Sequence, residues 1–233
     1  MSNPDKPTVV TTRWWWVRHA PVRSDGGNIY GQTDIACDTS DRHVFEAVAK
    51  ILPRGAVWVA SSLQRTHQTA EAIWATGFPK PATMPKDAAF AEQNLGQWQG
   101  MNRAAFLASR PAGSHWFADI GEPAPGGESF MDLYNRVCAA IYRITVENAG
   151  RDVIAVAHGG TIKAAIGLAL GQPDKGLAFD IDNCSVTRLD RYVNESVSVW
   201  RLPMVNQQPW IADAAHRAMH QPAGPEVTTS KLA

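Results

Sequence analysis

Apolar residues along the chain form short, nearly continuous runs that alternate with longer runs at helical spacing. Three short runs, at residues 13–18, 56–60 and 152–157, consist mainly of Val, Ala, Ile and Trp. Apolar runs of this length are typical of strands that are buried on both faces in a parallel sheet. We therefore predict three central strands at these positions.

The longer runs predict helices between the strands. Phe45, Val48 and Leu52 recur at helical spacing and are followed by Pro53, which ends the pattern. Similar spacing predicts three further helices, over about 63–76, 130–144 and 161–170. Near the end of the chain, residues 185–191 and 196–201 alternate between apolar and polar, which predicts a final hairpin.

Strands that alternate with helices predict an α/β protein with a mostly parallel sheet. A chain of 233 residues suits one domain, which we expect over residues 13–202. Residues 1–12 are expected to form a flexible N-terminus, and 203–233 a proline-containing C-terminal tail. Residues 101–126 are expected to form a lid-like excursion that contains a short helix.

The three predicted strands end beside residues that suit phosphate binding. In chain order these are Arg18 and His19, Ser62 and Arg65, and His158 with Gly159 and Gly160. In open α/β sheets, ligands bind beyond the carboxyl ends of the strands. An imidazole can attack phosphorus, arginines stabilise the charge of the transferring group, and glycines at a helix start let backbone N–H groups approach an anion. The pattern predicts a site that handles a phosphoryl group.

Transfer of a phosphoryl group also requires an acid that protonates the leaving oxygen. Glu92 is the candidate, because it ends the short run 88–91 and begins the glycine-containing stretch 93–100. Ser62 has two interpretations that the sequence leaves open. Its hydroxyl either supports the phosphate or caps the helix that follows.

Four short motifs follow one another over about residues 13–201. They are Arg18-His19, Ser62-x-x-Arg65-x-x-x-Thr69-Ala70, Glu92-x-x-x-Gly96-x-Trp98-x-Gly100 and His158-Gly159-Gly160. In this order they resemble the histidine phosphatase superfamily, the phosphoglycerate mutase-like group. The resemblance implies a three-layer α/β/α sandwich whose mostly parallel sheet contains one antiparallel strand.

The resemblance also implies a role for each site residue. His19 is the nucleophile that becomes phosphohistidine, and Arg18, Arg65 and His158 surround the phosphate. Glu92 acts first as acid for the leaving group and then as base for water. The chemistry implied needs no metal and no other cofactor. We expect the His19 side chain to be accessible at the surface, so that its removal leaves no cavity.

Two positions next to the acid bear on the choice between phosphatase and mutase. The mutases carry an arginine and a tyrosine there, where this chain has Gln93 and Leu95. We therefore expect hydrolysis of a small-molecule phosphate monoester. In its motifs the chain most resembles small phosphatases such as α-ribazole phosphatase. A phosphoglycerate-type mutase and a non-catalytic module that binds a phosphorylated ligand stay open as alternatives.

Composition narrows the class of partner. Lys plus Arg and Asp plus Glu both number 22, so the formal net charge is zero and does not favour nucleic acid or a membrane surface. Cys37, Cys138 and Cys184 lack metal-ligand spacing, which favours reduced thiols in a cytoplasmic protein. No apolar run reaches the roughly 20 residues of a membrane span. A homodimer stays open.

Overall fold

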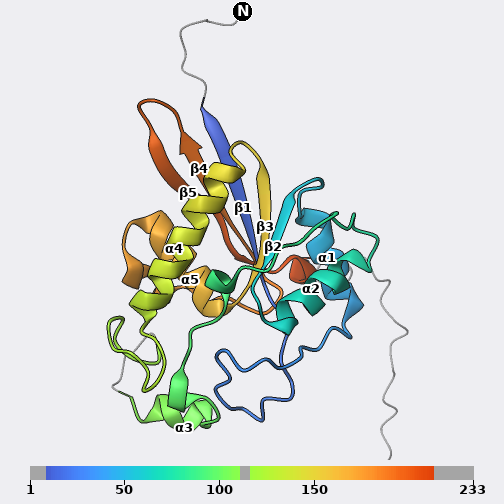
Figure 1. Ribbon diagram of the computed structural model, residues 1–233. Helices are drawn as coiled ribbons and strands as arrows, with labels where there is room; N and C mark the ends of the chain where they lie inside the picture. The colour runs from blue at the N-terminus through green and yellow to red at the C-terminus, as the bar shows by residue number, and fades with distance from the viewer. Residues whose placement is uncertain (1–8, 111–115, 213–233) are drawn as a thin grey trace, which may run out of the picture.

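A five-stranded mixed sheet forms the centre of the molecule (Figure 1). The structure is a computed structural model, and it describes residues 9–110 and 116–212. The spatial order is β2-β3-β1-β4-β5. The strands are β1 (Val10–Arg18), β2 (Val57–Ala60), β3 (Asp152–Ala157), β4 (Val186–Val193) and β5 (Ser198–Gln207). β1 and β2 are parallel to β3, and β4 is antiparallel to β1 and to β5. Hence β4 alone opposes the other strands, which confirms the mostly parallel sheet.

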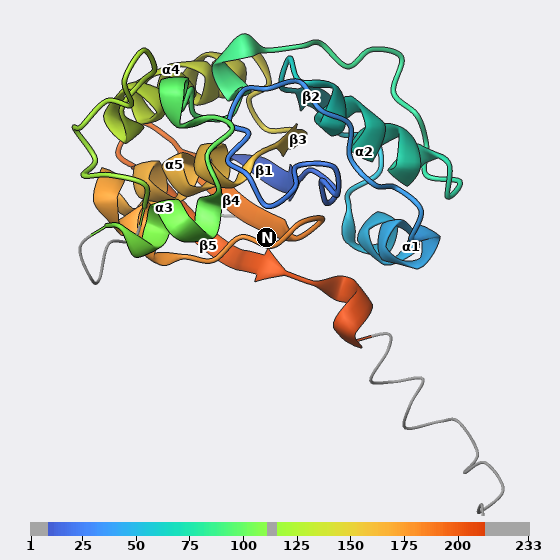
Figure 2. The same ribbon diagram turned by 90° about the horizontal axis from the view of Figure 1, so that it is seen from below.

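Helices cover both faces of the sheet, and Figure 2 shows the resulting layers from below. α1 and α2 lie on one side, whereas α4 and α5 lie on the other. Their bounds are α1 (Arg42–Ile51), α2 (Gln64–Trp74), α3 (Arg103–Ala108), α4 (Phe130–Glu147) and α5 (Gly159–Leu170). Three short 3₁₀ helices span Ala88–Phe90, Gly96–Trp98 and Pro173–Ala178. The predicted three-layer α/β/α sandwich is confirmed.

The alternation of side chains along β1 divides the interior into two cores. Trp14 and Trp16 are fully buried in the core beneath α4 and α5, stacked with ring centroids 5.2 Å apart. Trp15 and Val17 point to the opposite face and pack in the core beneath α1 and α2. Burial of this much aromatic surface fixes the register of the strand, because a shift by one residue would exchange the two faces.

The ends of the domain extend beyond the expected bounds. β1 begins at Val10, and β5 continues through Gln207, so residues 10–12 and 203–207 belong to the sheet. Pro203 does not end β5, because an edge strand tolerates a residue without a backbone N–H. The rest of the expected tail from residue 213, the first eight residues, and 111–115 of the excursion lie outside the described residues.

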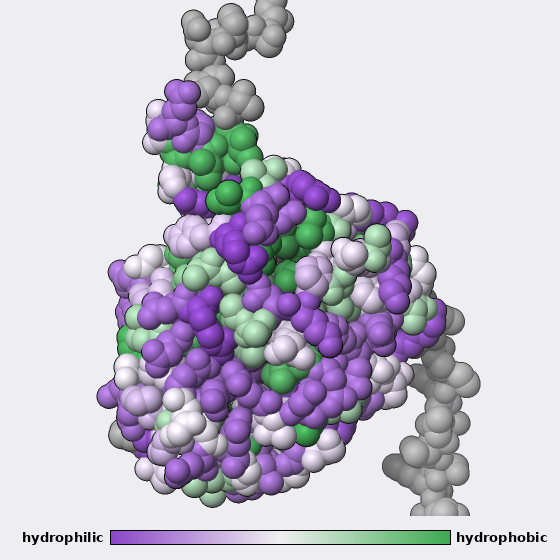
Figure 3. All heavy atoms as spheres, in the orientation of Figure 1, coloured by the Kyte–Doolittle hydropathy of each residue, from purple (hydrophilic) through white to green (hydrophobic). Residues whose placement is uncertain are grey.

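The surface of the described part is mostly hydrophilic in the view of Figure 3. Exposed apolar residues include Val10 at the start of β1, and Val193, Val197 and Val199 of the β4–β5 hairpin. Within residues 9–110 and 116–212, no helix combines the length and the apolar character required to cross a lipid bilayer.

Candidate active site

The parallel strands bring the predicted site residues together at one edge of the sheet. The backbone N–H of His19 donates to the carbonyl of Ala157 at 3.0 Å, and that of Ser61 donates to the carbonyl of Val156 at 3.2 Å. These bonds continue the pairing of the strands beyond their ends. The rings of His19 and His158 consequently lie with their centroids 5.1 Å apart.

His19 is oriented by its own chain. Its Nδ1 lies 2.7 Å from the carbonyl oxygen of Ala20. A carbonyl only accepts hydrogen bonds, so Nδ1 carries the proton and Nε2 keeps its lone pair. Burial, followed by the charges of Arg18 and Arg65, lowers the pKa of His19 well below its usual value. The imidazole is therefore neutral at pH 7, as a nucleophile requires.

The expectation that the His19 side chain is accessible at the surface was wrong. Only 1% of the residue is exposed. The ring of Tyr30, from the loop after β1, lies 6.4 Å from that of His19, and His158 directly follows the neighbouring strand β3. Because parallel strand ends converge here, neighbouring segments enclose a residue that directly follows a central strand.

His158 links the two neighbouring strand ends. Its Nδ1 accepts a hydrogen bond from Arg65 Nε at 3.2 Å, so its proton lies on Nε2, which donates to Ser61 Oγ at 2.7 Å. Burial, together with the charge of Arg65, lowers the pKa of His158 well below its usual value. In this arrangement His158 is a neutral, buried group that fixes the orientation of Arg65.

Arg65 is fully buried at the start of α2, where the helix dipole disfavours a cation. Backbone carbonyls of the loop after the nucleophile offset this cost. Nη1 donates to Thr33 at 2.9 Å, and Nη2 donates to Gly31 at 2.7 Å. With the bond to His158, three of its five N–H groups have partners among the described residues, which leaves two for an anion.

Arg18 supplies a second guanidinium, which lines a cavity at this edge of the sheet. Its Nη1 donates to the carbonyl of Ile181 at 2.5 Å. Its Nε is buried and has no hydrogen-bond partner in the described part of the chain. A buried unpaired N–H group is costly, and a bound anion would relieve that cost.

Glu92 lies two residues after the first 3₁₀ helix, Ala88–Phe90, and lines the same cavity. Its Oε2 accepts a hydrogen bond from the backbone N–H of Gly160 at 3.3 Å, and its Oε1 accepts one from that of Gln93 at 2.9 Å. The N-terminus of α5 therefore holds the carboxyl group, and the carboxyl group faces the space beside Arg18.

The two glycines at the start of α5 differ in what they require. A Cβ on Gly160 would lie 2.4 Å from Glu92 Oε1, which is closer than atoms can approach. A Cβ on Gly159 would lie 3.7 Å from Arg18 Nε, an ordinary contact. Gly159 lines the cavity as expected, but Gly160 is the position where only glycine lets the acid approach.

The two serines after β2 differ in burial. Ser62 is exposed, and it does not cap α2, whose N-cap is Leu63 without a side-chain cap, so the capping interpretation was wrong and a contact with phosphate stays a prediction. Ser61 is fully buried and binds His158 instead. The sequence contained a signal for this choice, because Ser61 directly follows the buried strand.

The cavity itself has a volume of about 250 Å³. Its outer wall combines aromatic and charged side chains that the sequence motifs did not predict. Lys163 Nζ donates to the carbonyl of Leu177 at 3.0 Å and lies 5.3 Å from the ring centroid of Trp116. Burial lowers the pKa of Lys163. The remaining wall includes Tyr30, Arg103, Phe117 and Asp180.

Among residues 9–110 and 116–212, no cluster of three or more His, Cys, Asp or Glu residues could hold a metal ion. The positive charge in this site is supplied by arginine side chains. Arg65 binds His158, and the charges of Arg18 and Arg65 act on both imidazoles, so the arrangement can bind a phosphoryl group and present a nitrogen nucleophile to it.

Comparison with known proteins identifies the family. The model of the histidine phosphatase superfamily, branch 1, matches residues 14–202. The chain belongs to the histidine phosphatase superfamily. The resemblance to this superfamily is thus confirmed, and the match covers β1 to most of β5.

Two relatives of this histidine phosphatase cover most of its length. Glucosyl-3-phosphoglycerate phosphatase of Mycolicibacterium vanbaalenii is 30% identical over 84% of this chain and 95% of its own. Phosphoglycerate mutase-like protein 4 of Arabidopsis thaliana is 26% identical over 75% of this chain and 72% of its own. The family thus includes relatives named as phosphatases and as mutase-like proteins.

Solved structures share the fold of this histidine phosphatase. A mycobacterial glucosyl-3-phosphoglycerate phosphatase is 27% identical with a TM-score of 0.70, over 84% of this chain and 99% of that one. Phosphoglycerate mutase from Bacillus anthracis has a TM-score of 0.71 at 17% identity, over 90% of this chain and 98% of that one. The second likeness establishes the fold alone.

Proposed function

We propose that this histidine phosphatase hydrolyses a small phosphate monoester through a phosphohistidine intermediate on His19. The observation that carries the proposal is the state of that imidazole. It is neutral, because burial and the charges of Arg18 and Arg65 lower its pKa, and its Nδ1 proton is held by the Ala20 carbonyl, which leaves the lone pair on Nε2. The mechanism has two steps, each with a role for Glu92.

In the first step, His19 Nε2 forms a bond to phosphorus while the bond from phosphorus to the ester oxygen breaks. The electron pair of that bond stays on the leaving oxygen, which takes a proton from the Glu92 carboxyl group. Arg18 and Arg65 stabilise the charge on the three equatorial oxygens. His19 then carries the phosphoryl group and a positive charge, which its Nδ1–H contact with Ala20 helps to stabilise.

In the second step, water attacks phosphorus and transfers a proton to the Glu92 carboxylate. The bond from His19 Nε2 to phosphorus breaks, and its electron pair returns to the imidazole, which becomes neutral again. Inorganic phosphate leaves, and Glu92 is protonated as at the start. In both steps the arginines stabilise the negative charge on the phosphoryl oxygens.

Hydrolysis is favoured over mutase activity by the contacts of Gln93 and Leu95. Gln93 is 2% exposed and uses its side chain within the protein, donating to the Glu128 carbonyl and accepting from Trp116. Leu95 is buried in an apolar cluster. Neither residue offers a cationic or phenolic group to hold a phosphoglycerate for return transfer.

The outer wall of the cavity supports a substrate whose alcohol is larger than glycerol and carries a second polar or anionic group. Trp116 and Phe117 offer apolar contact area, and Arg103 and Lys163 offer positive charge. Relatives at 30% and 27% identity are named for glucosyl-3-phosphoglycerate, so a phosphorylated sugar acid leads the substrate candidates. α-Ribazole phosphate remains a second candidate from the motif resemblance.

We propose further that the enzyme acts on a free metabolite in the cytoplasm. All three cysteines, Cys37, Cys138 and Cys184, are free thiols, as expected of a reducing compartment. A homodimer remains a prediction.

The test is phosphate release from a panel of monoesters in the presence of a chelator. The panel contains an aryl phosphate, sugar phosphates, phosphoglycerates, glucosyl-3-phosphoglycerate and α-ribazole phosphate. We expect release that is lost in His19→Gln, since Gln keeps a donor for the Ala20 carbonyl but lacks the nucleophile. Interconversion of phosphoglycerates that needs a bisphosphate primer would instead identify a mutase, and binding without turnover would identify a binding module.

A further inference from the structure

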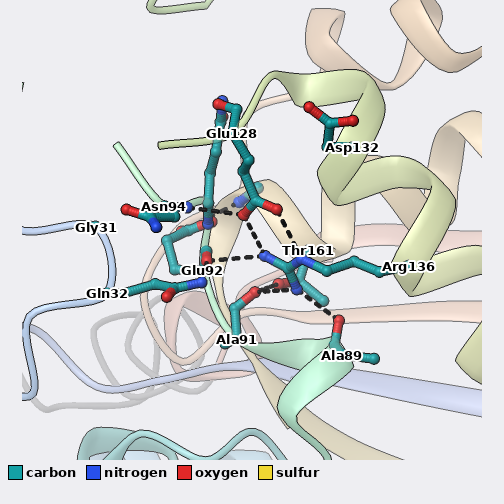
Figure 4. A network of polar contacts seen from close by, with 12 residues as sticks. Gly31, Gln32, Ala89, Ala91, Glu92, Asn94, Glu128, Asp132, Arg136 and Thr161 are labelled. Atoms are coloured by element: carbon teal, nitrogen blue, oxygen red, sulfur yellow. Dashed lines mark hydrogen bonds and ion pairs between the residues drawn. The ribbon is translucent and has the colours of Figure 1, made fainter. Parts of the chain in front are cut away.

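One arginine of α4 holds the backbone that leads to Glu92, as Figure 4 shows. Arg136 Nη1 donates to the carbonyls of Ala89 at 2.7 Å and Ala91 at 2.9 Å, and Nη2 donates to the carbonyl of Glu92 itself at 3.0 Å. A single planar group thereby fixes this segment at three points. Gln32 adds a fourth bond, from its Nε2 to the Glu92 carbonyl at 2.9 Å.

Glu128 fixes the guanidinium in turn. Its carboxylate accepts from Arg136 Nε at 3.0 Å and from Nη2 at 2.6 Å, a bidentate pair. The side chains are only 24% and 18% exposed, so water competes weakly for these bonds. Oε1 of Glu128 also accepts from the backbone N–H of Asn94 at 2.8 Å. The pair therefore holds the chain on both sides of Glu92.

The carboxyl end of Glu92 is held less firmly than its backbone. It accepts two backbone N–H groups, from Gly160 at 3.3 Å and from Gln93 at 2.9 Å. Its distance from the leaving oxygen is therefore set mainly by where its backbone lies. An acid works only within hydrogen-bond reach of the atom that it protonates, and a shift of about 1 Å can cost on the order of 100-fold in rate.

We propose that Arg136, held by Glu128, is a positioning residue for proton transfer by Glu92. Arg136 does not line the cavity and acts only through the Glu92 backbone. This inference rests on the proposed function, because it assumes that Glu92 protonates the leaving group. It predicts that Arg136 affects the acid step selectively, whereas a merely structural ion pair would affect stability or all substrates alike.

Leaving-group dependence separates these cases. Alkyl phosphates have poor leaving groups and need the acid, but 4-nitrophenyl phosphate releases a stable anion and does not. The parameter to compare is kcat/KM, because it covers the steps through release of the alcohol or phenol and excludes hydrolysis of phosphohistidine. We define selectivity as the fold loss for the alkyl substrate divided by the fold loss for the aryl substrate.

The experiment compares Arg136→Met, Arg136→Lys and the control Arg143→Met. Arg143 lies on the same helix, pairs with Asp87 and Glu147, and is 53% exposed at its side chain. Within the described part of the chain it makes no direct hydrogen bond to residues 89–94. We expect Arg136→Met to lose alkyl activity selectively by about 10- to 100-fold, since a full acid contributes about 100- to 10,000-fold. Arg136→Lys should lose less, and Arg143→Met should show no selectivity.

A double variant links the effect to the acid. Arg136→Met should cause no further selective loss in a Glu92→Gln background, because the proton that it positions is then absent. Circular dichroism and a thermal midpoint establish that each variant is folded at the assay temperature. Should Arg136→Met fail to fold, Arg136→Lys and Glu128→Gln supply the same comparison.

Equal losses for alkyl and aryl substrates in the Arg136 variants, with selective loss in Glu92→Gln, would overturn the positioning role and leave the proposed function standing. Additive selective losses in the double variant would overturn it as well. A Glu92→Gln variant that slows both substrates equally would overturn the acid role itself, and the positioning role with it.

Discussion

At the scale of single residues, the site depends on which atoms are left without partners. His19 Nδ1 and His158 Nδ1 face opposite kinds of partner, a carbonyl acceptor and an arginine donor. Opposite tautomers follow, and within the described part of the chain His19 Nε2 has no hydrogen-bond partner, whereas His158 Nε2 binds Ser61. The two histidines therefore suit different roles in the proposed mechanism, His19 as the nucleophile and His158 as the partner that orients Arg65.

Substitution of Gly160 tests the close approach of Glu92. Gly160→Ala should lower kcat/KM for alkyl phosphates by at least about 10-fold. The new Cβ would lie 2.4 Å from Glu92 Oε1, so the carboxyl group has to move away from its present position. Steady-state kinetics on alkyl and aryl phosphates measure this loss, and equal losses for both kinds of substrate would argue against this geometry.

The sequence pattern predicted the residue types of the candidate site but not every position. It pointed to Ser62, whereas Ser61 is the serine that binds His158, because the pairing of β2 with β3 continues one residue beyond the strand. It missed Arg136 altogether. An arginine on an amphipathic helix resembles a solvated residue in sequence, and only the fold places it against the carbonyls of the acid segment.

At the scale of elements, hydrophobic periodicity predicted the strands and long helices because burial determines both. β3 matches its predicted bounds, and α5 begins two residues earlier than expected, at Gly159. The continuation of β5 past Pro203 was not predictable from the pattern, since strand position within the sheet decides whether proline is tolerated. From the excursion expected over residues 101–126, Arg103, Trp116 and Phe117 line the cavity.

α4 begins with a capping box that local sequence encodes. The Ser129 hydroxyl accepts from the Asp132 N–H, and the Asp132 carboxylate accepts from the Ser129 N–H. Ser129→Ala should lower the free energy of unfolding by about 1 kcal/mol. Urea denaturation measures the change, with the exposed Ser62→Ala as a control. A change below about 0.3 kcal/mol would show that the cap contributes little to the fold.

At the scale of the whole molecule, a net charge of zero coexists with a concentrated cationic site. Arg18, Arg103 and Lys163 line the cavity together with Glu92 and Asp180, and Arg65 lies buried behind it beside His158. A zero net charge does not favour nucleic acid, whereas the local group of cations suits the phosphate monoester that we propose as substrate. Net charge did not predict this local group of cations, whereas the positions of the arginines after the predicted strands did.

Burial of neutral His19 and His158 makes global stability depend on pH. Their pKa values are lowered well below 6.5 in the folded state, so below about pH 6.5 the unfolded chain binds protons that the folded chain does not. The free energy of unfolding should fall as the pH drops, by up to about 1.4 kcal/mol per pH unit for each histidine. Denaturation between pH 7.5 and 5.5 measures this slope, and His158→Gln should reduce it. A flat profile in the native chain would contradict the neutral state of both rings.

The central claim is that His19 carries the phosphoryl group. The most direct measurement is rapid acid-free quenching of the enzyme with a radiolabelled substrate, followed by peptide mapping. The account predicts an acid-labile, base-stable label on the peptide that contains His19, absent from His19→Gln and present at higher level in Glu92→Gln when a good leaving group is used. A label on another residue, or turnover without any label on the enzyme, would contradict it.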